Sequence, residues 1–408
     1  MKDQTIYRYT GEDMTLTYNI PINLSDEDRL FWEQLLNESA KAYDECAERI
    51  RSKGIRLDIK SVHDEVYAWL REKHPIIPSQ GIIKTYKDVI SALRSMKSNK
   101  HKGGNTPVKH GLSMRLDKRL YANLDRSGIS ISGSHRGKRA RVTFSLFPKA
   151  EEMFSKYTTA DPLIFLRDGM FYLSVPFNVP EMPVDGNTCI GVDMGIKRFF
   201  VTSEGNVFKD KAYADRRRKV RYNKSKLKVQ NTKSAKRKLK KLKHKEQNMS
   251  KDMCYRAANA LIRSTKASVI VMEDLSKIKQ TTSKTKEGYK RKRHNNAISQ
   301  VPFYKFREIL TYKALLSGKE VVTVSPVDTS RINSRTGKKD GIREGCRYRC
   351  LDGVVLDADW NASINIGRRS KHPTSSSLPV DGKLSPLSAG TCQRANRGSE
   401  SLCKPLSL

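Results

Sequence analysis

Residues 188–205 read TCIGVDMGIKRFFVTSEG, and the apolar run at the start of this stretch is typical of a β-strand that contains one carboxylate, Asp193. Two further carboxylates stand in apolar settings much later in the chain. Glu273 ends the run ASVIVME, and Asp359 comes just before the helical pattern NASINI in VVLDADWNASINI. A strand can hold a carboxylate rigidly at a sheet edge, and carboxylates gathered there bind hard divalent cations such as Mg²⁺. The three segments therefore predict a metal site to which distant parts of the chain contribute.

The rest of the chain is strongly basic. Among 408 residues, 79 are Lys or Arg and 43 are Asp or Glu, which gives a formal net charge of +36. Such an excess predicts a polyanionic partner, with a membrane surface as the weaker alternative. There is no apolar run long enough to cross a bilayer and no signal peptide at the start. The seven cysteines are scattered and odd in number, so they indicate no disulfide framework and are typical of a reducing cytosol.

The order of the expected elements favours an α/β RNase H-like fold. The strand with Asp193 is followed by a hairpin, a Lys/Arg-rich helical stretch at 209–251 and the buried strand that ends at Glu273. A helix over 301–317, a second buried strand EVVTVSP and a final helix from NASINI complete the order. A mixed sheet of this kind brings the first strand beside the strand that ends in the Glu. Two Mg²⁺ ions would relieve the repulsion among three carboxylates and leave positive charge for a scissile phosphate.

Each carboxylate also has a plainer interpretation. Asp193 near a strand end could be a turn or cap residue, and Glu273 competes with the adjacent Asp274. Asp359 competes with Asp357, and it could simply cap the helix that follows. The joint pattern of the three segments, rather than any one residue, is what favours a catalytic site.

The front half of the chain predicts a mixture of strands and helices. Residues 1–24 contain TLTYNIPIN, an alternating strand pattern. Helices are expected to begin near Ser25, Ser61 and Ser79, because a capping residue precedes a helical apolar pattern at each position. Residues 112–185 are β-rich.

A resemblance to the RuvC-like nuclease domain is carried by three segments, GVDMGIKRFFVTS, VIVMEDLSKI and DADWNASINI. The chain resembles most closely the TnpB family of RNA-guided insertion-sequence nucleases, and almost as closely the compact type V CRISPR effectors. The family's first Asp falls on Asp193 and its Glu on Glu273. Its last Asp precedes x-Asn-Ala, which selects Asp359 over Asp357. Strong resemblance covers residues 186–368, and the front half is similar mainly in layout.

The resemblance implies an RNA-guided DNA endonuclease that is Mg²⁺-dependent. Two Mg²⁺ ions would be held by Asp193, Glu273 and Asp359, and the partners would be a guide RNA and a target double-stranded DNA. Two alternatives stay open: an RNA-guided DNA-binding repressor without cleavage, and a guide-free RuvC-like resolvase or transposase. The expected location is the bacterial or archaeal cytoplasm, with nucleoid association when DNA is bound, and monomer and dimer are both compatible with the sequence.

The resemblance also implies a domain layout with a helical insert inside a wedge domain that resembles a β-barrel. The stretch between the last strand and the final Asp is polar and is expected to be irregular, and the Ser/Pro-rich end is expected to be disordered. The expected domains are a β-rich wedge at 1–24 and 112–185, a helical recognition insert at 25–111, a RuvC-like nuclease domain at 186–325 and 354–370, a target-strand loading insert at 326–353 and a tail at 371–408.

The chain departs from the family at the zinc knuckle, which is usually built from two Cys-x-x-Cys pairs. Residues 331–334 read RINS where the first pair should stand. At the second pair Cys350 remains, but Gly353 replaces its mate. Cys346 is nearby, yet two cysteines cannot fill a tetrahedral structural zinc site. We therefore expect a degenerate knuckle that packs without zinc.

Basic surfaces predict the nucleic-acid contacts. The 209–251 run has the alternative of a solvated helical face, but its charges are nearly all positive, which favours nucleic acid. In the family, helices at this place line the channel of the guide–target duplex. The helix from Ser79 resembles the segment that inspects a flanking DNA motif, although Ser79 could be only a cap and Tyr86 only core. The loop at 284–293 could be a lid over the site or a plain surface loop. The candidate nucleic-acid-binding residues are Arg216, Arg217, Arg218, Arg221, Lys236, Arg237, Lys240, Lys241, Ser79, Gln80 and Lys84.

Overall fold

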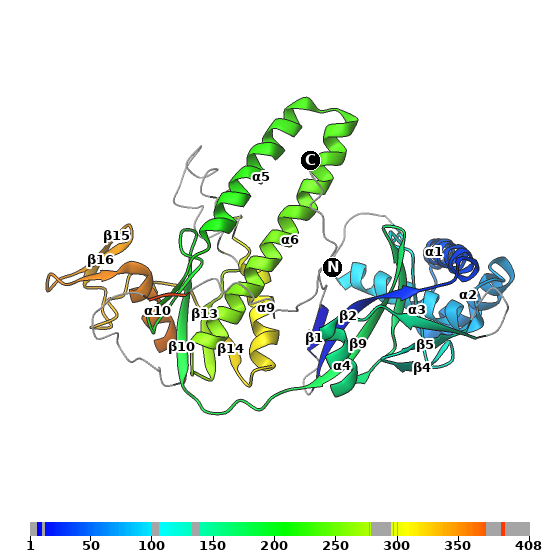
Figure 1. Ribbon diagram of the computed structural model, residues 1–408, viewed down its shortest axis with the longest axis horizontal. Helices are drawn as coiled ribbons and strands as arrows, with labels where there is room; N and C mark the ends of the chain where they lie inside the picture. The colour runs from blue at the N-terminus through cyan, green and yellow to red at the C-terminus, as the bar shows by residue number, and fades with distance from the viewer. Residues whose placement is uncertain are drawn as a thin grey trace, which may run out of the picture. The chain divides into compact units, whose positions relative to one another are not determined.

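The computed structural model separates into two compact parts, Met1–Pro180 and Glu181–Leu408. Figure 1 shows the elements of both. The loop at 284–293 and nearly all of the tail at 371–408 lie outside the described residues. The described residues are 6–9, 13–98, 106–132, 139–276, 278, 295–296, 298–299, 301–372 and 385–387.

The first part is built on one sheet that curls into a half-barrel. Its strand order is β3-β8-β9-β2-β6-β5-β4, with β1 paired to β2 and β7 paired to β9. The long strands β2 and β9 run antiparallel through its middle, and their buried residues alternate with less buried ones, as a one-sided core requires. The strands are β1 Ile6–Tyr9, β2 Asp13–Asn23, β3 Ser113–Arg115, β4 Tyr121–Asp125, β5 Gly128–Ile131, β6 Ala140–Phe144, β7 Thr158–Thr159, β8 Leu163–Arg167 and β9 Met170–Pro180.

Three consecutive helices interrupt this sheet between β2 and β3, where the sequence predicts them. The first begins directly after Ser25, whose hydroxyl accepts a hydrogen bond from the backbone N–H of Asp28 at 3.2 Å. The second begins two residues before Ser61, because Asp58 is its N-cap and accepts from the Ser61 N–H at 2.9 Å. The helices are α1 Asp26–Ser52, α2 Ile59–Lys73 and α3 Ser79–Ser98, with a shorter α4 Pro148–Lys156 later in the chain.

The second part contains a six-stranded mixed sheet with the order β14-β13-β10-β11-β12-β18. Strand β10 lies inside the sheet, antiparallel to β11 and parallel to β13. The strand that carries Asp193 therefore lies beside the strand that ends at Glu273, as the element order predicts. The strands are β10 Cys189–Met194, β11 Phe200–Thr202, β12 Asn206–Phe208, β13 Val269–Glu273, β14 Glu320–Val324 and β18 Ser385–Leu387.

The basic run folds as two long helices, α5 Lys211–Gln230 and α6 Lys233–Ser264. They lie side by side in Figure 1 and turn at Asn231, which has a left-handed φ of 46°. Helix α9 Phe303–Leu315 packs against α6. None of the helices in the described ranges is long and apolar enough to cross a membrane.

The last helix, α10 Ala358–Arg368, packs directly on β10. Gly191 makes this possible, because a Cβ at that position would lie 1.9 Å from the carbonyl oxygen of Ser363. The indole Nε1 of Trp360 also donates to the carbonyl of Ser203 at 3.0 Å. These contacts fix the start of α10, and with it the position of Asp359, over the central strand.

Two sequence expectations about the region before α10 are wrong. EVVTVSP was expected to be a buried strand, but β14 is the edge strand of its sheet and its residues are half-buried or exposed. Residues 326–353 were expected to be irregular, but part of this stretch forms an antiparallel hairpin. Its strands are β15 Gly341–Glu344 and β16 Arg347–Cys350, and β17 Val355–Asp357 adds to them as a third strand.

Candidate functional site

The three predicted carboxylates line one pocket of about 660 Å³ in the second part of the chain. Asp193 comes from β10, Glu273 from the last position of β13, and Asp359 from the first turn of α10. Residues separated by 166 positions in the sequence, from 193 to 359, are thus brought together. The pocket is also lined by Arg198 and Arg343.

Asp193 and Glu273 are neighbours through the parallel pairing of their strands. Val192 pairs with Met272, so the next residue of each strand lies at the same end of the sheet. The Thr329 hydroxyl, itself buried, donates a hydrogen bond to Oε1 of Glu273 and fixes the orientation of that side chain.

The competing Asp274 makes different contacts. Its carboxylate accepts from the backbone N–H of Ser276 at 3.1 Å and pairs with Arg307 at 3.3 Å. It lies at the same pocket but serves the turn after β13. The geometry therefore favours Glu273 as the functional carboxylate.

The pocket disfavours negative charge on Asp193 and Glu273. Burial raises the pKa of Asp193 well above its ordinary value, and the nearby charges of Glu273 and Asp359 raise it further, against the opposing effect of Arg343 and Arg198. Burial also raises the pKa of Glu273, although the hydrogen bond from the Thr329 hydroxyl opposes the rise. Carboxylates that are desolvated and repel one another are the arrangement that a bound cation stabilises.

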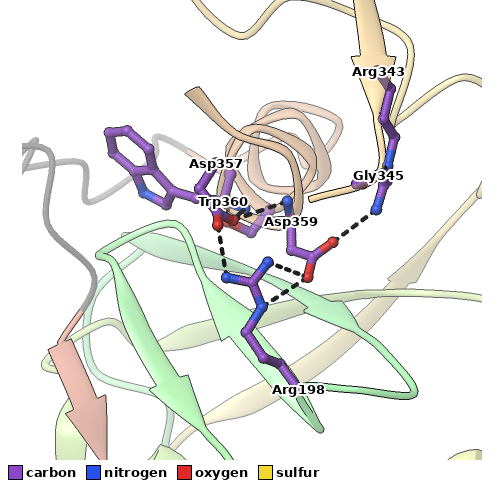
Figure 2. Close-up of polar contacts among 7 residues, drawn as sticks. Arg198, Arg343, Gly345, Asp357, Asp359 and Trp360 are labelled. Carbon is purple, nitrogen blue, oxygen red and sulfur yellow. Dashed lines mark hydrogen bonds and ion pairs between the residues drawn. The ribbon is translucent and has the colours of Figure 1, made fainter. Parts of the chain in front are cut away.

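Asp357 and Asp359 have separate roles in the structure. Asp357 is the N-cap of α10, and its Oδ1 accepts from the backbone N–H groups of Asp359 and Trp360, both at 3.1 Å. Asp359 is therefore not needed as a cap, and its carboxylate is directed toward Arg198 and Arg343 (Figure 2). The structure therefore favours Asp359 over Asp357 as the pocket carboxylate, as the x-Asn-Ala signature does.

Two arginines that the sequence reasoning missed bind Asp359 (Figure 2). Arg198 donates from Nε to Oδ2 of Asp359 at 2.9 Å and from Nη1 to Oδ2 of Asp357 at 2.7 Å. Arg343 donates from Nη2 to the other Asp359 oxygen, Oδ1, at 2.8 Å, and its Nε donates to the Gly345 carbonyl at 3.3 Å. Arg198 lies within the first signature segment, five residues after Asp193, which was the only sequence signal for it.

The donor chemistry of the pocket fits a hard divalent cation, because three carboxylates supply oxygen ligands. In this structure Asp359 is bound by Arg198 and Arg343. Within the described ranges of the chain, no three His, Cys, Asp or Glu side chains are grouped closely enough to hold a metal ion. Asp193, Glu273 and Asp359 are the residues that would hold Mg²⁺ if Asp359 exchanged its arginine partners for the metal.

Two parts of the chain match known protein families. Residues 172–284 match the OrfB_IS605 family of probable transposases, and residues 303–366 match the TNB domain of Cas12f1-like proteins. TnpB-like protein L79 of Acanthamoeba polyphaga mimivirus is 26% identical over 266 residues, which are 59% of this chain and 49% of that protein. The endodeoxyribonuclease Cas12f2 of a Micrarchaeota archaeon is 28% identical over 132 residues, 30% of this chain and 24% of that protein. The chain resembles TnpB proteins and compact type V effectors.

The likeness to these relatives has a limited extent. The chain spans about half of the length of the viral TnpB-like protein and about a quarter of the archaeal Cas12f2. The fold is similar to that of Cas12f1 in a complex with its single guide RNA and target DNA. That match has a TM-score of 0.53 and 17% identity, and it covers 86% of this chain and 84% of Cas12f1.

The stretch before α10, which the sequence predicts to be a degenerate knuckle, packs through apolar and amide side chains. Cys350 is buried in a cluster with Tyr348 and Ala358, whereas Cys346 is exposed, and both are free thiols. The Tyr348 hydroxyl donates to the carbonyl of Arg331 at 2.9 Å.

Two buried asparagines of NASINI connect the knuckle to α10. Asn361 accepts from the N–H of Ser334 at 2.7 Å and donates to the carbonyl of Ile332 at 2.7 Å. Asn365 donates to the carbonyls of Ile332 and Thr329 at 2.7 Å and 2.9 Å. The segment that lacks the first cysteine pair is therefore held against the helix that carries Asp359.

The basic residues proposed for nucleic acid lie on the surface of α5 and α6. A pocket of about 420 Å³ lies at the start of α5 and shares residues 195–197 with the carboxylate pocket. Arg217, Arg218 and Arg221 line it. Arg217 is half-buried over the Tyr213 ring at 5.7 Å. The exposed candidates are Arg216, Arg218, Arg221, Lys236, Arg237, Lys240 and Lys241.

The candidates on α3 are already engaged within the first part of the chain. Gln80 donates to Asp117, and Lys84 lies 3.8 Å from both Asp117 and Asp161. Ser79 is the first residue of α3, and Tyr86 is buried with its hydroxyl 3.0 Å from Nδ1 of His63. Tyr86 is therefore core, and a DNA-reading role for the other three stays a prediction.

Proposed function

We propose that this chain is an RNA-guided DNA endonuclease with an RNase H-like, RuvC-type catalytic centre. The observation that carries the proposal is that Asp193, Glu273 and Asp359 line one pocket. The strand order β12-β11-β10-β13-β14 supports it, since β10 to β12 are antiparallel and β10, β13 and β14 are parallel. This order places the strand of Asp193 beside the strand that ends at Glu273, which supports the RNase H-like expectation.

The chemistry would be metal-assisted hydrolysis of a phosphodiester. When bound, Mg²⁺ would activate the attacking water and stabilise the leaving oxygen. The chain's own residues orient the ligands. The Thr329 hydroxyl orients Glu273 by a hydrogen bond. Because Asp357 caps α10, the carboxylate of Asp359 is not used as the cap and faces the pocket. Arg198 and Arg343 place positive charge where an incoming phosphate would lie.

The proposed partners are a guide RNA and a target DNA. The named relatives support this assignment, because the Cas12f1 of similar fold was determined with a guide RNA and a target DNA. The exposed cations of α5 and α6, together with the net charge of +36, supply the electrostatic attraction that phosphate backbones need. Such contacts position a duplex without reading its sequence, so pairing with the guide would provide specificity.

A cleavage assay on a guide-matched DNA tests the proposal. We expect the wild-type protein–RNA complex to cut in Mg²⁺, and Asp193→Asn or Glu273→Gln to lower the rate by about a thousandfold or more while RNA binding is retained. Asp274→Asn is the matched control, because this carboxylate serves a turn and should leave cutting within a few-fold of wild type. Full activity in Asp193→Asn would refute the site assignment.

One alternative is favoured by a specific observation. Both oxygens of Asp359 are bound by arginines, as would suit an RNA-guided DNA-binding protein that does not cut. In that case the wild-type complex would bind its target in Mg²⁺ and leave it intact. Sequencing of the co-purified nucleic acid distinguishes an RNA-guided protein from a guide-free resolvase or transposase, because no defined RNA species would co-purify with a guide-free protein.

A further inference from the structure

Both carboxylate oxygens of Asp359 are bound by arginines, and these partners are on two different elements. Arg198 lies between β10 and β11, and Arg343 lies on β15 of the knuckle hairpin. The Arg198 and Asp359 side chains are only 17% and 18% exposed, and that of Arg343 is 36% exposed. These ion pairs are therefore partly shielded from water, where the attraction between opposite charges is stronger than on an open surface.

The two arginines and a divalent cation compete for the same carboxylate. Arg198 donates two N–H groups to Oδ2 of Asp359, and Arg343 donates to Oδ1. Both oxygens are thus occupied by cationic donors. A metal ion that bound Asp359 would compete with these donors and would be repelled by their positive charge.

A phosphate group can relieve this competition. Arg198 and Arg343 line the same pocket as the three carboxylates, so a phosphodiester that enters it would meet both guanidinium groups. Guanidinium binds phosphate oxygens in the same forked geometry as carboxylate oxygens. Arg198 also keeps Asp357 as a partner at 2.7 Å, which would hold it at the pocket after it released Asp359.

We propose, on the basis of the function above, that Arg198 and Arg343 form a clasp on Asp359 that hinders metal loading until the phosphate backbone of a bound strand draws the arginines away. Metal and nucleic acid then bind with positive coupling. By linkage, each raises the affinity of the other by the same factor. Arg198 and Arg343 are positioning residues in this scheme, because they act on the metal site through Asp359.

Mn²⁺ binding to the nucleic-acid-free protein, followed by electron paramagnetic resonance, tests the clasp. We expect Arg198→Gln to bind Mn²⁺ about tenfold more tightly than wild type, the factor that corresponds to the loss of one charge-assisted hydrogen bond that competes with the metal. Arg198→Lys should be intermediate, since Lys lacks the fork but keeps the charge. Damage to the fold would instead weaken Mn²⁺ binding, so a gain identifies the clasp. Arg343→Gln provides the same test if Arg198→Gln does not fold.

The coupling is tested with two short single strands of one sequence. A phosphorothioate-linked strand keeps the backbone charge and resists cleavage, whereas a methylphosphonate-linked strand is neutral. We expect the charged strand to raise the Mn²⁺ affinity of wild type several-fold and that of Arg198→Gln by less, and the neutral strand to change neither.

Two results separate failure of the clasp from failure of the proposed function. Equal Mn²⁺ affinities for wild type, Arg198→Gln and Arg343→Gln, all folded, would overturn the clasp and leave the nuclease proposal standing. Mn²⁺ binding that is unchanged by Asp193→Asn would remove the metal site itself, and both proposals with it.

Discussion

Asp193 is unfavourable for folding at neutral pH, and we propose that it is nonetheless required for function. It is desolvated on the central strand and faces two other carboxylates, which together raise its pKa well above the ordinary value of 3.8. The folded protein therefore binds this proton more tightly than the unfolded chain does. The associated stability is complete below about pH 4 and is lost as the pH rises through the raised pKa.

A stability prediction follows for the metal-free protein. At pH 7 the wild type is destabilised by the unfavourable ionisation of the Asp193 carboxyl, whereas Asp193→Asn has no group that ionises at this position. We expect the Tm of the variant to exceed that of wild type by about 2–4 °C at pH 7, equivalent to about 1 kcal/mol. The difference should close as the pH approaches 4. Thermal denaturation across this pH range is the measurement, and a wild type that is the more stable protein at pH 7 would contradict the account.

At the scale of elements, the contact between β10 and α10 sets the position of the site. Strand β10 carries Asp193, and α10 carries Asp359 in its first turn. The two approach so closely at Gly191 that an added Cβ would meet backbone atoms of Ser363 and Gly367 at 1.9 Å and 2.5 Å. Backbone atoms cannot rotate away as a side chain can, so the helix itself would have to move.

Gly191→Ala should therefore damage both stability and cleavage. We expect a loss of about 1–3 kcal/mol in the free energy of unfolding, as for other overpacked sites, together with a large fall in cutting rate as Asp359 shifts. Gly111→Ala is the matched control, because no atom lies within 4 Å of its added Cβ. Denaturant unfolding and the cleavage assay measure the two effects. An unchanged Gly191→Ala protein would show that this contact does not position the site.

Elements differ in how far the sequence predicts them. The buried strands of Asp193 and Glu273 and the basic helices follow from local apolar and charge patterns, which their neighbours do not alter. The exposure of β14 follows from its place at the sheet edge, which no local pattern records. The hairpin of β15 and β16 was missed because β15 has no buried residue and β16 has only two, Tyr348 and Cys350.

In the candidate site, too, some residues could be predicted from the sequence and others could not. The strand ends predict Asp193 and Glu273, and the resemblance to the family selects Asp359 through x-Asn-Ala, because each of these signals depends on its own segment. The arginines that bind Asp359 could not be predicted, since Arg198 and Arg343 reach it only through the packing of β10, β15 and α10. Arg198 and Arg343 lie 161 and 16 residues from Asp359 in the sequence, so they meet it only in the folded chain.

At the scale of the whole molecule, charge is divided between an acidic pocket and a basic surface. The net charge is +36, yet four carboxylates, those of Asp193, Glu273, Asp274 and Asp359, line one pocket beside the basic helix α5. Basic residues attract a phosphate backbone, and the carboxylates would repel it except where Arg198, Arg343 or a bound cation offset their charge. This division of charge is the physical reason for placing metal-assisted cleavage in the pocket.

The most direct test is a crystal structure of the chain with Mn²⁺ and a bound phosphorothioate strand, with anomalous scattering used to locate the metal. The account predicts an anomalous peak within coordination distance of carboxylate oxygens of Asp193, Glu273 and Asp359, about 2.0–2.2 Å for a hard divalent cation of this size. Metal peaks elsewhere, with these three carboxylates turned away from one another, would contradict it.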